Sequence, residues 1–271
     1  MNTFSTTSCL GYRVFTDHLD HLPKTKNTVI NTINQYSYCM AKKDALFKKT
    51  LHASDVLLPD GIGITFAAKF LYGKKIKKIA GADLHAYFLN SLEKKGGSCF
   101  YLGASPETLE KIKIKMQQEY PNIKVGAYSP PFKKTFSTVD NAQMITAVNN
   151  FNPDVLFIGM TAPKQEKWSF DHKDALNTGY ICAIGAVFDF YAGTVARPSE
   201  VWQKLGLEWL GRLIKEPRRM WTRYVTHGFI YLGYLLQAKL KGPELETEAK
   251  NAPKTETKAK IKTAIEIEVE N

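Results

Sequence analysis

The chain has 271 residues, of which 44% are hydrophobic and 23% are charged. This length can bury one sizeable core, so we expect one globular domain with an appendage. The formal net charge of +11 favours an anionic partner, and charge alone does not choose among a nucleic acid, a phosphorylated substrate and an acidic membrane surface.

The N-terminal stretch MNTFSTTSCLGYRVF lacks the positively charged start and the long apolar core of a secretory signal, so we expect a cytoplasmic protein. The four cysteines, Cys9, Cys39, Cys99 and Cys182, stand far apart and show no paired spacing. They predict neither a disulfide framework nor a zinc site. We expect reduced thiols, with Cys99 and Cys182 in the core.

From about residue 27 to 190, short apolar runs alternate with longer amphipathic ones, which is typical of parallel strands joined by crossover helices. Ala82–Lys95 has apolar residues at roughly i, i+3, i+4 spacing, and Pro106–Glu119 begins with proline after a Ser105 cap. The sequence therefore predicts an open α/β sheet. Its predicted strands are Thr28–Thr32, Val56–Leu58, Ser98–Leu102, Ile123–Ala127, Val155–Gly159 and Tyr180–Ile184.

Past Pro198 the pattern becomes helical, aromatic and basic, with breaks expected at Pro217 and near Gly228. We therefore divide the chain into a catalytic domain at 1–197, an appendage at 198–240 and a tail at 241–271. The tail has no aromatic residue and few apolar ones before its last stretch, so we expect it to be mostly disordered.

The appendage has three interpretations: a solvated helix face, a phosphate clamp and a membrane-surface element. Its aromatic residues disfavour the first. The apolar stretch from Thr226 to Leu240 is shorter than the roughly 20 residues that a spanning helix needs. An element lying on a bilayer, with arginines toward anionic headgroups and aromatic rings in the interface, fits better.

Polar residues follow the predicted strands at their carboxyl ends, where open α/β sheets bind ligands. Asp60 joins an apolar run ending in Pro59 to a glycine-containing run that looks helical. A carboxylate there is fixed by the sheet and open to the cleft, so it is a candidate general base, although a turn or helix cap also fits. The other candidates at these ends are Thr32, Asn34, Gly103, Lys164 and Gln165.

Gln165 would lie in the first turn of a helix opened by Pro163, where free amides and the helix dipole favour an anion, although a solvated turn is an equal alternative. Gly61 and Gly63 would let the backbone approach a phosphate, but the third glycine of a dinucleotide fingerprint is missing. Asp189, between aromatic residues, suggests a buried structural acid more than a catalyst.

Asp17 and His21 suggest a cap on a surface helix more than metal ligands, because no further histidine or cysteine pair supports them. There is also no Asp-x-Asp stretch of the kind that holds a metal-bound nucleotide diphosphate. We therefore expect no metal and no cofactor, with basic side chains taking the metal's place.

An ordered set of motifs resembles the WecG/TagA/CpsF glycosyltransferases over about residues 8 to 235. The ordered set is specific, although each motif alone is weak. The motifs are Thr32-Ile-Asn34, Leu58-Pro-Asp-Gly-Ile-Gly63, Ala80-Gly-Ala-Asp-Leu84, Tyr101-Leu-Gly103, Pro130-Pro-Phe132, Gly159-Met-Thr-Ala-Pro-Lys-Gln-Glu166, Gly185-Ala-Val-Phe-Asp-Phe190, Gly206-Leu-Glu-Trp-Leu-x-Arg212 and Glu216-Pro-Arg-Arg219.

The resemblance implies a Rossmann-like fold and a transferase that moves a sugar, often N-acetylmannosamine or its uronate, from a UDP donor to a polyprenyl-diphosphate-linked GlcNAc in surface-polymer synthesis. Asp60 matches the family's proposed base. Thr32, Asn34 and Gln165 match positions that hold the sugars. Arg212 and Arg219 match arginines of an appendage that closes over the cleft and meets the diphosphate and the membrane.

Two positions depart from the family pattern. Lys78 stands where the family usually has an arginine, and a lysine lacks the bidentate guanidinium fork. Thr222 stands where a later arginine is expected, with Arg223 next to it. We place Lys78 among the candidate diphosphate contacts and leave the role of Arg223 open.

The resulting hypothesis is a metal-independent, inverting glycosyltransferase, peripheral on the inner face of the bacterial cell membrane. It binds no nucleic acid, and the sequence leaves open whether it forms a homo-oligomer. Two alternatives stay open: an NAD-dependent oxidoreductase on a similar sheet, and a basic nucleic-acid-binding module without a recognisable motif.

Overall fold

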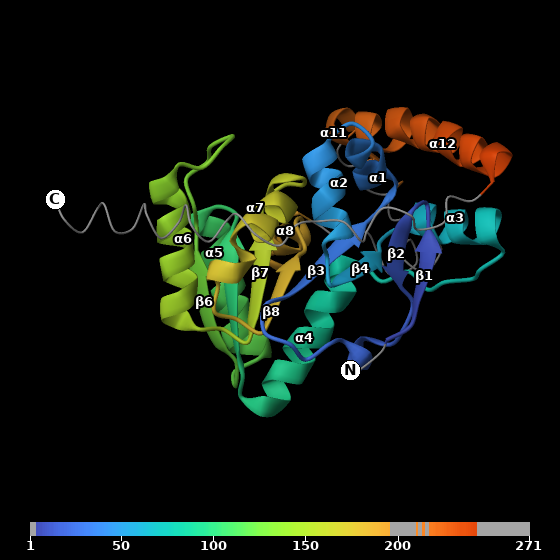
Figure 1. The fold of residues 1–271 in the computed structure, drawn as a ribbon. Helices are drawn as coiled ribbons and strands as arrows, with labels where there is room; N and C mark the ends of the chain where they lie inside the picture. Colours follow the sequence, from blue (N-terminus) through green and yellow to red (C-terminus); the bar gives the residue numbers. More distant parts are fainter. Residues whose placement is uncertain (1–3, 196–209, 211–212, 215–216, 243–271) are drawn as a thin grey trace.

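The computed structural model describes residues 4–195, 210, 213–214 and 217–242 (Figure 1). Its centre is a six-stranded sheet in the order β4-β3-β8-β7-β5-β6, and every neighbouring pair of strands is parallel. The predicted fold class is confirmed, and each strand begins and ends within one residue of its prediction. The strands are β3 (Thr28–Ile33), β4 (Val56–Pro59), β5 (Ser98–Gly103), β6 (Lys124–Tyr128), β7 (Val155–Gly159) and β8 (Tyr180–Ala183).

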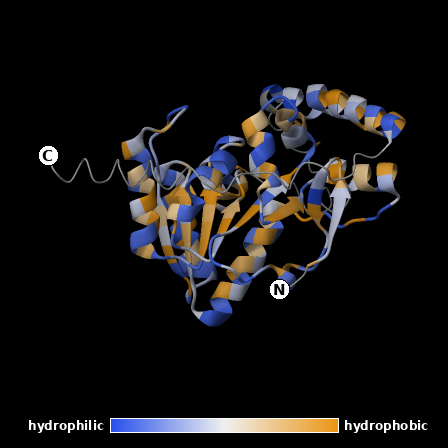
Figure 2. Cartoon of the chain, in the orientation of Figure 1, coloured by the Kyte–Doolittle hydropathy of each residue, from blue (hydrophilic) through white to orange (hydrophobic). Residues whose placement is uncertain are grey.

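Helices cover both faces of this sheet, because the strands are apolar on both sides (Figure 2). In β5, Cys99 and Tyr101 pack in one cluster with α4 (Gly81–Lys95), α5 (Pro106–Glu119) and α8 (Val187–Tyr191). Phe100 and Leu102 point the other way, as alternation along a strand requires, and pack with α6 (Thr138–Phe151) and α7 (Lys164–His172). The same face continues over β3 and β4, where α1 (Gln35–Ala41) and α2 (Ala45–His52) pack.

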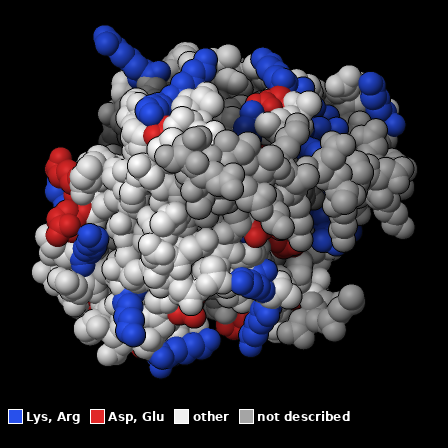
Figure 3. Space-filling model, turned by 60° about the vertical axis from the view of Figure 1, so that its left-hand side comes forward, with Lys and Arg blue, Asp and Glu red and all other residues white. Residues whose placement is uncertain are grey.

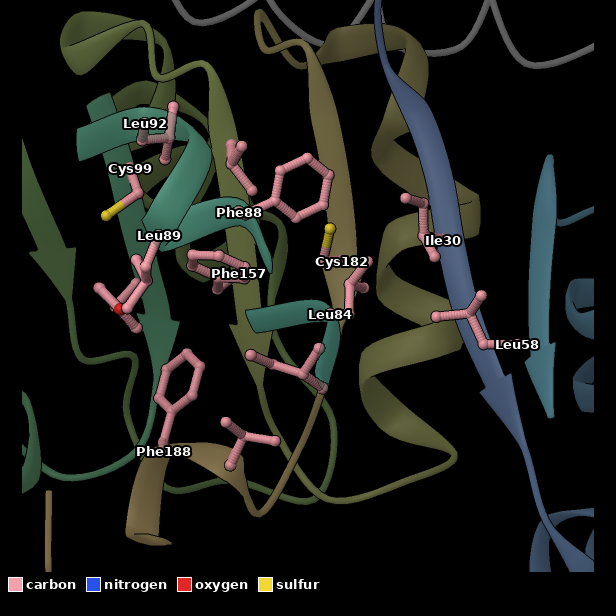
Figure 4. Packing of buried hydrophobic residues seen from close by; sticks show 14 of the residues in the cluster. Ile30, Leu58, Leu84, Phe88, Leu89, Leu92, Cys99, Phe157, Cys182 and Phe188 are labelled. Atoms are coloured by element: carbon pink, nitrogen blue, oxygen red, sulfur yellow. The ribbon is translucent and has the colours of Figure 1, made fainter. Parts of the chain in front are cut away.

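Helix α4 illustrates how the core forms. Its apolar residues Leu84, Phe88, Leu89 and Leu92 lie on one face and pack against side chains of the central strands (Figure 4). Burial of one such side chain contributes roughly 1.5–3 kcal/mol. The helix ends at Gly96, whose left-handed conformation is a common helix stop.

The four thiols are free and buried, as expected. Burial raises the pKa of the Cys99 thiol to about 12, so little of the reactive thiolate forms near neutral pH. These cysteines are therefore core residues, in agreement with their sequence context.

The N-terminal segment was not predicted to form strands, but β1 (Thr6–Cys9) and β2 (Tyr12–Phe15) form an antiparallel hairpin. Its two-residue turn, Leu10 and Gly11, has positive φ at both positions. Asp17 then accepts hydrogen bonds from the Ser5 and His18 amides and contacts His21 Nδ1. The expectation of a helix cap is wrong, because the following 3-10 turn Leu19–His21 begins after His18 without a side-chain cap.

The described end of the chain is helical. Helix α11 (Pro217–Trp221) leads through a π-helical turn (Thr222–Thr226) into α12 (His227–Lys241). Because residues 215–216 fall outside the described part of the chain, the break predicted at Pro217 stays a prediction. The break predicted near Gly228 lies next to the change from π-helical to α-helical geometry at His227. Residues 198–209 and the tail from 243 fall outside the described part of the chain.

Helix α12 packs on α1 and on α3 (Ile62–Tyr72). Tyr231 and Leu235 are buried there with Tyr38 and Ile64. The Tyr231 hydroxyl also donates a hydrogen bond of 3.0 Å to the Gly63 carbonyl. This packing supplies the free energy that offsets the cost of about 1 kcal/mol for Gly233 inside a helix.

Candidate active site

The carboxyl ends of β3, β4, β5, β7 and β8 open into one cavity of about 1320 Å³. The strand order changes direction here. The chain passes from β3 to β4 at one edge of the sheet and from β5 to β6 at the opposite edge. Ligands bind at such a reversal in open α/β sheets. Seven sequence-predicted site residues line this cavity: Thr32, Asn34, Asp60, Lys78, Gly103, Lys164 and Gln165.

Asp60 directly follows β4 and is partly exposed at the cavity wall. Its amide donates a 2.9 Å hydrogen bond to the Ile33 carbonyl, so the backbone of the neighbouring strand fixes its position. Gly61, with φ of 81°, begins α3 without a side-chain cap. Asp60 thus stands one residue before the N-cap position of α3.

Thr32 and Asn34 come from the end of β3. Asn34 caps α1, because its Oδ1 accepts from the amides of Tyr36 and Ser37 at 3.0 Å each. The Ser37 hydroxyl accepts from the Asn34 amide in return, which completes a capping box. With Oδ1 committed to the cap, the Nδ2 amide group is the part of this side chain suited to a ligand acceptor.

Gly103 has a structural requirement of its own. Its φ is 123°, and a Cβ there would lie 2.5 Å from the Gly159 carbonyl oxygen of the adjacent β7. Gly63, proposed as a phosphate approach, is likewise explained by packing, since a Cβ would meet the Gln35 side chain at 2.6 Å. Packing alone therefore accounts for glycine at position 63, and the approach of this backbone to a phosphate stays a prediction.

Several cationic side chains border the cavity. Lys164 Nζ donates to the Lys133 carbonyl and lies 3.5 Å from the Phe136 ring centroid. Partial burial lowers the pKa of Lys164, while the nearby Asp140 carboxylate opposes that shift. Lys78, Lys134 and Arg223 also line the cavity.

Arg223 belongs to the π-helical turn, and its guanidinium carbon lies 4.9 Å from the Tyr36 ring centroid. Thr222, which stands where the family arginine is expected, lines the same cavity. The cavity wall therefore includes both that position and the neighbouring Arg223. Arg219 lies in α11, where only its backbone is described, and Arg212 falls outside the described residues.

Two acids of the cavity wall differ from expectation. Asp189 is partly exposed and borders the cavity, so the expectation of a buried acid is wrong. Glu166 was not singled out, yet it is buried beside Gln165 and lines the cavity. An acid in the first turn of a helix ordinarily complements the helix dipole in solvent, so the local sequence gave no signal for its burial.

A smaller hollow of about 560 Å³ lies over α6, and among the described residues that line it there is no Asp, Glu, His, Cys, Lys or Arg. Within the described ranges, no three His, Cys, Asp or Glu side chains gather in a way that could hold a metal ion. The polar groups that could do chemistry are therefore concentrated at the carboxyl edge of the sheet.

The fold and the cavity define an α/β enzyme whose cation-lined site suits a phosphorylated ligand. The chain belongs to the WecG/TagA/CpsF family of glycosyl transferases, whose family model matches residues 5–244. This membership confirms the resemblance and favours the transferase over the oxidoreductase and nucleic-acid-binding hypotheses.

Two relatives are N-acetylglucosaminyldiphosphoundecaprenol N-acetyl-beta-D-mannosaminyltransferases. The one from Bacillus subtilis (strain 168) is 29% identical over 214 residues, which cover 78% of this chain and 81% of the relative. The one from Bacillus spizizenii is 27% identical over 215 residues, with the same shares covered.

Proposed function

We propose that the protein moves an N-acetylmannosamine-type sugar from a UDP-sugar to a polyprenyl-diphosphate-linked GlcNAc, with inversion at the anomeric carbon. The names of the two relatives support this acceptor and this transferred sugar. The UDP donor follows from the family resemblance. The observation that carries the mechanism is the position of Asp60 in a cavity that also holds the polar and cationic candidates.

In this mechanism the Asp60 carboxylate accepts the proton of the acceptor hydroxyl as that oxygen attacks the anomeric carbon. The new glycosidic bond forms while the bond from the anomeric carbon to the UDP oxygen breaks. A positioned base of this kind contributes about 10²–10⁴ in rate. Its backbone anchor to β3 limits the movement of the carboxylate away from that hydroxyl.

The departing diphosphate needs positive charge near its oxygens. Lys78, Lys164 and Arg223 line the same cavity and supply it, with Arg223 taking the part of the displaced family arginine. Arg212 and Arg219 remain candidates from the resemblance. The amide of Asn34, the hydroxyl of Thr32 and the side chain of Gln165 would bind the sugars.

A membrane-bound acceptor requires the protein to reach the bilayer. Within the described ranges, no helix is both long and apolar enough to span a membrane. Helix α12, however, exposes an apolar stripe on the face opposite its buried Tyr231 and Leu235. The stripe consists of Phe229, Leu232, Leu236 and Leu240, spaced as one face of a helix.

Exposed Trp221 lies in α11, and the basic residues Lys239 and Lys241 end α12. An apolar helix face with aromatic and basic neighbours is typical of a helix that lies in a membrane interface. We therefore propose that the α12 stripe rests on the inner face of the bacterial cell membrane and presents the cavity to the lipid-linked acceptor.

The decisive test is Asp60→Asn, which removes the proton acceptor and keeps the shape of the side chain. We expect its kcat with a short prenyl-diphosphate-GlcNAc acceptor to fall at least 100-fold, while UDP-sugar affinity and thermal unfolding stay near those of the wild type. Asp174→Asn, at an exposed carboxylate remote from the cavity, is the matched control. Wild-type turnover by the Asp60 variant would refute the assigned base.

A further inference from the structure

Glu166 and Gln165 form a buried polar pair in the wall of the cavity. Their side chains are only 2% and 4% exposed, and both residues line the cavity. Gln165 Nε2 donates a 3.0 Å hydrogen bond to Glu166 Oε1. The two groups thus fix each other's orientation in the first turn of α7.

One oxygen of each residue remains unsatisfied. Gln165 Oε1 and Glu166 Oε2 have no hydrogen-bond partner among the described residues, although both atoms are buried. An unpaired buried polar atom costs about 1–3 kcal/mol, so such atoms are uncommon unless they await a ligand or water. Two adjacent unsatisfied oxygens in a cavity wall are therefore candidates for ligand contacts.

The cavity of about 1320 Å³ leaves room for a ligand beside this pair. Gly185, two residues after β8, lies close to Gln165, since an added Cβ would be 3.4 Å from Gln165 Oε1. Its φ of 56° also disfavours any side chain there. The positive charge of Arg223 lowers the pKa of Glu166, against the larger effect of burial.

The chemistry of the two oxygens selects the ligand class. Hydroxyl groups and an acetamido N–H are neutral donors that can satisfy adjacent acceptors. A diphosphate would bring further acceptors to the same place, and the ionised form of Glu166 would repel its negative charge. A sugar ring, with several hydroxyls at neighbouring positions, therefore fits the pair better than the diphosphate does.

We infer that Glu166 is a sugar-binding residue of this site: it holds the Gln165 amide in place and, with it, presents two acceptor oxygens to hydroxyl or acetamido donors of a substrate sugar. The inference deepens the proposed function and rests on it. Glu166 takes no part in the proposed proton transfer, so this role in sugar binding is separate from the catalytic step.

The test measures binding separately from turnover. Calorimetric titrations of the full chain use UDP, UDP-N-acetylmannosamine and a short prenyl-diphosphate-linked GlcNAc. Glu166→Met keeps the side-chain length and removes its hydrogen bonding. We expect it to weaken at least one of the two sugar ligands about tenfold or more and to leave UDP binding within about twofold.

The two sugar ligands distinguish the donor sugar from the acceptor sugar. Glu166→Gln retains hydrogen-bonding atoms, so its loss of affinity should be smaller than that of Glu166→Met. Asp171→Asn, at an exposed acid on the same helix, is the control and should bind all three ligands like the wild type.

Unchanged sugar binding by Glu166→Met would overturn the inference, and so would an equal loss for UDP, which would indicate general damage to the site. If Glu166→Met does not fold, the same criteria apply to Glu166→Gln. Failure of the wild type to bind any UDP-sugar is a separate outcome, because it overturns the proposed function on which the inference rests.

Discussion

At the scale of single residues, Glu166 is the buried acid of the cavity wall. Its burial depends on how α7 packs against the rest of the site.

The burial of Glu166 predicts a pH-dependent stability. Burial raises the pKa of its carboxyl from 4.5 to about 7, and Gln165 and Arg223 oppose that shift. The folded state therefore holds this proton more tightly than the unfolded state does. Below pH 4.5 the Glu166 carboxyl is protonated in both the folded and the unfolded state, so its ionisation does not change stability. The free energy of unfolding falls as pH rises from 4.5 to 7 and stays lower above pH 7.

Replacing the carboxyl by an amide removes this titration. We expect Glu166→Gln to raise the thermal midpoint relative to the wild type at pH 8, by roughly 5 °C more than at pH 5, because the rise of the pKa from 4.5 to about 7 corresponds to about 3 kcal/mol at full effect. Thermal unfolding followed by circular dichroism from pH 5 to 8 measures it, with Asp174→Asn as control. Midpoints that stay parallel across this range would contradict the expected burial cost.

The sequence predicted the positions of site residues better than their environments. Asp60 and Gln165 follow recognisable strand ends and helix starts, so their place at the cavity could be predicted from local pattern. The burial of Glu166 could not be predicted, because it depends on tertiary packing. For Asp189 the aromatic sequence neighbours suggested burial that the tertiary structure does not give it.

At the scale of elements, the parallel strands were predictable because each is an apolar run bounded by turn residues. The hairpin of β1 and β2 was not, because Leu10 occupies a positive-φ position where Asn or Gly is the usual signal. Helix α12 begins at His227, next to the break predicted near Gly228, and its stability comes from contacts with α1 and α3 rather than from local propensity.

The two faces of α12 predict separable effects. Phe229 and Leu236 are 73% and 50% exposed, so replacing both with serine leaves the packed face intact. We expect the double variant to bind anionic liposomes at least tenfold more weakly, because two large apolar side chains no longer enter the bilayer interface. A vesicle co-sedimentation assay measures this binding.

Ile114→Ser on α5, at a side chain that is 50% exposed on another element, is the matched control for lost apolar surface. Activity on a short, soluble acceptor should be unchanged in the double variant, which separates docking from chemistry. Liposome binding equal to that of the wild type would count against the α12 stripe as the membrane face.

At the scale of the whole molecule, the site depends on segments that are distant in the chain. The sheet edge contributes residues from Thr32 to Gly185, and the C-terminal helices close one wall with Met220, Thr222, Arg223 and Tyr224. Local sequence pattern predicted the sheet edge and the C-terminal helices separately, but not that they meet at one cavity. Their meeting depends on the packing of α12 on α1 and α3. The excess of cations is likewise a property of the assembled cavity, since Lys and Arg lie scattered over the face seen in Figure 3.

This collected charge leads to a prediction about metal dependence. Lys78, Lys133, Lys134, Lys164 and Arg223 line the cavity that holds Asp60, and they come from four separate parts of the chain. Fixed cations can stabilise a departing diphosphate as a metal ion would. We therefore expect the initial rate of transfer to be the same with and without excess EDTA, and to fall when Lys78→Met or Arg223→Met removes one of these charges. A loss of activity in EDTA that magnesium fully restores would show that the side chains do not suffice and would assign the leaving-group charge to a metal.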